Sequence, residues 1–115
     1  MQSPVLVVEL YEPEEAARFL AVASIGLLKA VGDKIMTIAE AERLLFTPRT
    51  VRVLGEKGIS PKLCELVMDC CELDDVLDLL PLEFDVELNK MIDRFSDYIA
   101  STVSQDPYAA HARLK

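Results

Sequence analysis

The stretch Thr37–Pro61, TIAEAERLLFTPRTVRVLGEKGISP, decides the fold because it holds three helix starts within 25 residues. The first, Thr37-Ile-Ala-Glu40, has the form of a capping box, in which hydroxyl and glutamate side chains satisfy backbone amides of the first turn. Thr47-Pro48 and Ser60-Pro61 each join a capping hydroxyl to a proline that suits the first helical position. The pattern predicts short, sharply connected helices over residues 38–46, 48–56 and 62–71.

The segment before this stretch predicts a long helix over about residues 14–31. Its sequence is apolar almost all round. Arg18 and Lys29 are the exceptions, and at about 100° per residue they lie on nearly the same side of the helix, as one thin solvated stripe. We therefore expect this helix to lie at the centre of the core, with Gly26 at a close helix crossing.

The residues after Pro61 predict two more helices beyond the third short one. In the first, the i, i+3, i+4, i+7 spacing directs four side chains inward: Leu73, Val76, Leu77 and Leu80. The second is long, begins near Asp85 and carries a similar apolar side: Leu88, Met91, Ile92, Phe95, Tyr98, Ile99, Thr102 and Val103.

The two ends of the chain are predicted to be non-helical. Residues 4–11, PVLVVELY, are apolar and β-branched without a 3.6-residue period, which predicts a short strand or extended arm. Residues 105–115 form a polar tail. The 115-residue chain is thus predicted to be all-α, a compact single domain over residues 1–115, with five to seven mostly short helices around the apolar central helix.

Composition limits the classes of protein to which the chain can belong. With 51% hydrophobic and 28% charged residues it is typical of a globular domain. We recognise no targeting segment, and Arg18 and Lys29 interrupt the longest apolar run before it could span a bilayer. Three cysteines without a paired spacing suit a reducing compartment. We therefore expect a cytoplasmic protein that does not contact membranes.

The net charge of −8 comes from one part of the chain, residues 69–87. This part contains eight carboxylates and no Lys or Arg: Asp69, Glu72, Asp74, Asp75, Asp78, Glu83, Asp85 and Glu87. The rest of the chain holds the other 12 acids and all 12 bases, so it is neutral. Such a distribution disfavours nucleic acid, whose phosphates need a basic surface, and favours a basic protein partner.

The sequence CCELDDVLD, residues 70–78, raises the question of a thiol or metal site. Cys70 and Cys71 diverge by about 100° on a helix, and no second Cys or His cluster supplies further metal ligands. Cys64 shares a helical side with apolar residues and is interpreted as a small core residue. We expect packed thiols and no bound metal or cofactor.

The carboxylates of this segment have two main interpretations. Asp74, Asp75 and Asp78 project opposite the leucines and look equally exposed, whereas general acid and base groups need different environments. They form either a solvated side without a role or a surface that binds a partner. In the second case the predicted partner-binding residues are Asp69, Glu72, Asp74, Asp75 and Asp78.

A modest basic cluster surrounds the junction at Thr47-Pro48: Arg43, Arg49 and Arg52. A helix-turn-helix contact to phosphates is one interpretation, and surface ion pairs with Glu40, Glu42 or Glu56 are the favoured one. No catalytic residue is predicted because the chain has no recognised catalytic motif, and its one histidine, His111, lies in the polar tail.

Three blocks of sequence carry a resemblance to a known family: Gly26–Ala30 (GLLKA), Thr37–Pro48 (TIAEAERLLFTP) and Glu72–Pro81 (ELDDVLDLLP). Over about residues 13–100 the chain resembles a family of small uncharacterised bacterial proteins, a domain of unknown function. The resemblance implies a bacterial, helical, stand-alone domain and brings no function. It also makes the last block part of the family pattern, which favours a surface that is used.

These observations predict a small acidic bacterial interaction protein, not an enzyme, that binds a basic protein through residues 69–87. Immunity proteins and antitoxins that block a basic nuclease or similar toxin are examples of this class by charge and size. The alternative is a structural or regulatory homodimer in which residues 4–11 pair across a two-fold axis or pack into the neighbouring copy.

Overall fold

A computed structural model describes residue 10 and residues 12–102. This part of the chain is all-α and contains no strand. Its elements are α1 (Pro13–Gly32), α2 (Ile38–Leu44), α3 (Pro48–Glu56), α4 (Pro61–Cys70), α5 (Leu73–Leu79), the 3₁₀ turn η1 (Pro81–Glu83) and α6 (Phe84–Ser101). The predicted compact all-α domain is confirmed for these residues.

The helices differ in length. In the described part of the chain, four have nine residues or more, namely α1, α3, α4 and α6. Helices α2 and α5 are short, with seven residues each. Most of the predicted arm (residues 4–11) and the whole predicted tail (residues 105–115) lie outside the described residues.

The three predicted helix starts in Thr37–Pro61 are confirmed. At each start a hydroxyl oxygen accepts a hydrogen bond from the backbone N–H three residues later, which satisfies an amide that the helix leaves unpaired. The donor nitrogen lies 3.1 Å from the oxygen for Glu40 and Thr37, 3.0 Å for Thr50 and Thr47, and 3.4 Å for Leu63 and Ser60. These caps set where α2, α3 and α4 begin.

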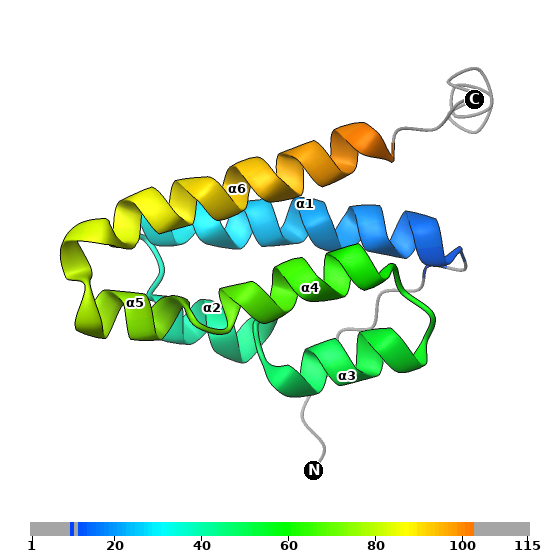
Figure 1. Cartoon of the computed structure of the whole chain (residues 1–115), viewed down its shortest axis with the longest axis horizontal. Coiled ribbons are helices and arrows are strands. Elements are labelled where there is room, and N and C mark those ends of the chain that lie inside the picture. Colours follow the sequence, from blue (N-terminus) through cyan, green and yellow to red (C-terminus); the bar gives the residue numbers. More distant parts are fainter. Residues whose placement is uncertain (1–9, 11, 103–115) are drawn as a thin grey trace, which may run out of the picture.

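The molecule has two layers, and the core lies between them. Figure 1 shows α1 and α6 lying side by side and antiparallel, with α5, α2 and α4 beneath them and α3 packed against α4. Fully buried side chains come from both layers, among them Leu28 of α1, Phe95 of α6, and Leu63 and Leu66 of α4. None of the helices in the described residues is both long enough and apolar enough to cross a membrane.

Helix α1 is less central than predicted. Phe19 and Val22 are exposed, and a Cβ placed on Gly26 would have no atom within 4 Å, so the predicted close crossing at Gly26 is wrong. The reason is that α6, α2 and α4 cover one side of α1 and leave the other side open. The predicted solvated stripe is also incomplete, because Arg18 is half-buried against α6.

Candidate functional site

The acidic segment, residues 69–87, runs from the end of α4 through α5 and η1 into α6. Its first acid, Asp69, is not part of the free acidic surface. The Asp69 carboxylate lies 2.9 Å from the guanidinium of Arg94 on α6, so its charge is already matched. The structure thereby separates Asp69 from the other predicted partner-binding residues.

The remaining predicted residues lie together at the start and along the outside of α5. Glu72, Asp75 and Asp78 are exposed, whereas Asp74 is half-buried, so the predicted equal exposure of the aspartates is wrong. The Asp74 carboxylate also accepts a hydrogen bond from the backbone N–H of Asp75, at 2.9 Å. Within the described residues none of these four carboxylates forms an ion pair with a Lys or Arg.

Glu42 joins this surface from α2, which the sequence did not indicate. Burial raises the pKa of Glu42 from its ordinary 4.5 to about 7, helped by the negative charge of Asp74, a hydrogen bond with the Asp74 side chain, and the charge of Asp75. A backbone hydrogen bond from Asp74 offsets part of the shift. No sequence signal pairs these residues, because α2 and α5 meet only through the tertiary fold.

The predicted partners of the basic cluster are not found in the described residues. Arg43, Arg49 and Arg52 are exposed, and none of them forms an ion pair with Glu40, Glu42 or Glu56 in this part of the chain. Glu42 instead faces carboxylates of α5. The negative charge next to α5 is therefore not neutralised from α2.

Glu42 and Asp74 line a cleft of about 750 Å³ that we call the α2–α5 cleft. Part of its wall is apolar: Val31, Ile35, Met36, Ile38, Leu77 and Phe84. The charged lining residues are Glu40, Glu42, Asp74, Asp78, Asp85 and Lys34. Five carboxylates thus surround an apolar hollow in which Lys34 is the one basic residue of the described lining.

Next to the cleft, large apolar side chains point into solvent. This exposed apolar ridge consists of Leu77, Leu79, Leu80, Leu82 and Val86, and it includes Leu79 at 77% and Leu82 at 97% exposure. The prediction that Leu77 and Leu80 turn inward is wrong. Helix α5 ends at Leu79 after two turns, and among the four predicted residues Leu73 is buried and Val76 packs against the core.

The cysteines are packed rather than grouped. Cys70 is fully buried, and burial raises the pKa of its thiol to about 12, so it stays protonated at neutral pH. The half-buried Cys64 and Cys71 thiols donate to the backbone carbonyls of Ile59 and Val67. Among the described residues, no three His, Cys, Asp or Glu side chains are grouped as metal ligands.

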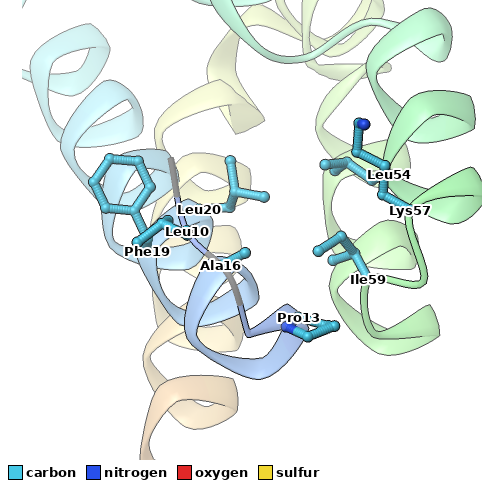
Figure 2. Close-up of a pocket in the computed structure, with 8 residues that line it drawn as sticks. All are labelled: Leu10, Pro13, Ala16, Phe19, Leu20, Leu54, Lys57 and Ile59. Atoms are coloured by element: carbon cyan, nitrogen blue, oxygen red, sulfur yellow. The ribbon is translucent and has the colours of Figure 1, made fainter. Parts of the chain in front are cut away.

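A second hollow of about 480 Å³ lies at the other end of the molecule, between α1 and the α3–α4 connection. Figure 2 shows its mostly apolar lining: Leu10, Pro13, Ala16, Phe19, Leu20, Leu54, Lys57 and Ile59. Leu10 is the first residue that the structure describes, and we call this hollow the N-terminal groove.

A comparison with protein families finds a match that covers most of the chain. The family model described as "Protein of unknown function (DUF3969)" matches residues 11–110. No curated protein and no solved structure matches the chain significantly.

Proposed function

Because the chain belongs to the DUF3969 family of proteins of unknown function, we propose its role from its surface: it is a small interaction protein that binds a basic protein partner through the acidic segment. It acts by binding, in the cytoplasm, and not by catalysis. The observation that carries the proposal is the set of unneutralised carboxylates along α5, namely Glu72, Asp74, Asp75 and Asp78. An immunity protein or antitoxin that covers a basic toxin is the class that suits this charge and size.

The local electrostatics supports a cationic partner. Burial and, after it, the negative charge of Asp74 raise the pKa of Glu42 to about 7, so at neutral pH an ionised Glu42 beside Asp74 is disfavoured. A Lys or Arg side chain of a partner would relieve this repulsion and replace the proton. Such complementarity also speeds association and weakens as salt screens it.

Charge reversal tests the proposal. The triple variant Asp74→Lys, Asp75→Lys and Asp78→Lys should abolish capture of the partner in a pull-down from the source cells, and the captured protein should be basic. A matched control with the same net charge reverses three exposed acids elsewhere: Glu56, Asp93 and Asp97. Equal capture by both variants, or capture of an acidic protein, would rule out the acidic segment as the binding surface.

The N-terminal groove favours a second candidate, a homodimer held by residues 4–11. Leu10 lines an apolar groove beside the exposed Phe19, and an apolar groove suits the apolar, β-branched arm of a second copy. Sedimentation of the full chain and of a chain without residues 1–11 tests this candidate. A dimer that survives the deletion rules out the arm as the main contact.

A further inference from the structure

The acidic surface is also an apolar surface. Five large apolar side chains are exposed between Leu77 and Val86, and Ile35, 79% exposed, lines the same cleft as Leu77. Exposed apolar patches of this kind on soluble proteins commonly mark contacts with other molecules. A partner that offered only positive charge would leave these side chains in water. A partner that fits the whole surface therefore carries apolar side chains as well as positive charge.

The shape of the surface combines a projection with a hollow. Leu79 and Leu82 project from the α5–η1 turn, and the α2–α5 cleft beside them offers about 750 Å³ with Phe84 and Met36 in its wall. The carboxylates of Asp74, Asp78 and Asp85 line the same cleft. Apolar and anionic groups therefore line the same cleft, and a binding partner has to match both.

The secondary structure of the partner follows from what surrounds the cleft. The described elements here are helices and a 3₁₀ turn, with no strand edge whose backbone a partner strand could extend. An apolar hollow flanked by charged side chains suits a helix laid in a groove, which buries apolar residues at i, i+3, i+4 and i+7 and leaves charged residues at the flanks.

We propose that the partner docks through a cationic amphipathic helix, whose apolar side covers the exposed apolar ridge and the α2–α5 cleft while its Lys and Arg side chains reach Glu42, Asp74 and Asp78. This inference rests on the proposed function and adds the chemistry of the partner's binding element. Charge complementarity selects the occupant, because a neutral helix would leave five cleft carboxylates facing an apolar surface.

The position of Glu42 gives this docking a pH dependence. The charged and titratable groups near it are Asp74 and Asp75 of α5, Cys71 at the end of α4, Lys34 of the α1–α2 loop, and its helix neighbours Glu40 and Arg43. A helix cation beside Glu42 and Asp74 favours the ionised pair, so binding releases the Glu42 proton and is tighter above neutral pH than below it.

Two synthetic peptides of about 18 residues test the proposal with the full chain. Both contain only Leu and Lys in the same numbers: one places the leucines on one side of a helix, and the other has a scrambled order. Fluorescence anisotropy should show binding of the amphipathic peptide at least about ten-fold tighter than binding of the scrambled one.

Two variants of the chain locate the binding. Leu79→Ser with Leu82→Ser should weaken binding of the amphipathic peptide by about ten-fold. The control, Phe19→Ser with Val22→Ser, removes exposed apolar side chains from α1 and should change the affinity by less than about two-fold. Circular dichroism verifies that each variant remains folded, which is expected because the four side chains lie outside the core.

The outcomes separate this inference from the proposed function. If both peptides bind equally and only the triple charge reversal removes binding, charge recognition stands and the amphipathic helix is wrong. If neither peptide binds, both proposals fail for this surface. If the chain sediments as a dimer that Leu79→Ser with Leu82→Ser dissociates, the occupant is a second copy and the inference is overturned.

Discussion

The guanidinium of Arg94 on α6 lies 2.9 Å from the Asp69 carboxylate at the end of α4. Ion pairs such as Lys29–Asp33, Lys62–Glu65 and Lys90–Glu87 join positions three or four apart in sequence, whereas this one links two helices. It fixes the start of the acidic segment against the last helix, beside the fully buried Cys70.

Removing this link should cost stability. We expect Arg94→Ala to lower the free energy of unfolding by about 1 kcal/mol, near the upper limit for exposed pairs, because Asp69 then loses its partner while still half-buried. Chemical denaturation measures the change. Lys90→Ala, which breaks the exposed local pair with Glu87, is the control and should cost less than about 0.5 kcal/mol. Equal losses would contradict the role of the interhelical pair.

Glu42 should make stability depend on pH. Its raised pKa means that the folded state binds the proton more tightly than the unfolded chain. This contribution is fully present below 4.5 and is lost as the pH rises through about 7. Glu42→Gln should therefore raise the free energy of unfolding at pH 8 by about 1 kcal/mol, after allowance for solvent screening, and the gain should fade toward pH 4.5.

Denaturant titrations at several pH values check this prediction. The exposed Glu65 of α4 provides the matched control, Glu65→Gln. If both variants show the same pH dependence, the pairing of Glu42 with Asp74 does not control the titration.

Replacing Ser24 by alanine should stabilise the fold. Its side chain is fully buried in α1, and its hydroxyl has no hydrogen-bond partner among the described residues. Ser24→Ala removes this cost and should raise the free energy of unfolding by about 1 kcal/mol more than Ser96→Ala, an exposed position in α6. The control carries the same gain in helix propensity, so urea denaturation of the two variants isolates the buried hydroxyl. A gain no larger than that of Ser96→Ala would show that the hydroxyl is satisfied.

Two glycines should respond in opposite directions to alanine. Gly26 lies in a helix with open space around its α-carbon, so Gly26→Ala should stabilise the fold by about 0.5–1 kcal/mol. Gly58 has φ +77°, a conformation that alanine adopts only with strain, so Gly58→Ala should destabilise by about 1 kcal/mol. Thermal unfolding of both variants measures the signs. If Gly26→Ala instead destabilises the fold, another helix lies close to Gly26, and the open space that the structure shows there is wrong.

The sequence predicted best those features that depend on residues a few positions apart. The caps at Thr37, Thr47 and Ser60 depend on groups three residues apart, so composition and order were enough to predict them. The apolar side of α6 followed from periodicity, which is also a local property: the predicted Leu88, Met91, Phe95 and Tyr98 are buried. Periodicity does not show, however, which part of a helix has another helix packed against it. Leu77 and Leu80 were therefore predicted to be buried, whereas they are exposed at the end of α5.

The candidate site depended more on the tertiary fold. Asp74, Asp75 and Asp78 were found from charge, but Glu42 joins them only because α2 packs against α5. Asp69 was assigned to the free surface because nothing in the sequence shows that Arg94, 25 residues later, lies beside it. The cleft and the exposed apolar ridge also arise from how helices end and meet, which no local pattern encodes.

The antiparallel pairing of α1 with α6 has a consequence for the order of folding. Arg18 near the start of α1 donates to the carbonyl oxygen of Ile99, 2.9 Å away, and to the hydroxyl of Thr102 at the end of α6. Helix α1 leaves the ribosome before α6, so the part of its apolar side that α6 covers stays exposed until α6 has been made. The pairing of these two helices is therefore a late, long-range step in folding.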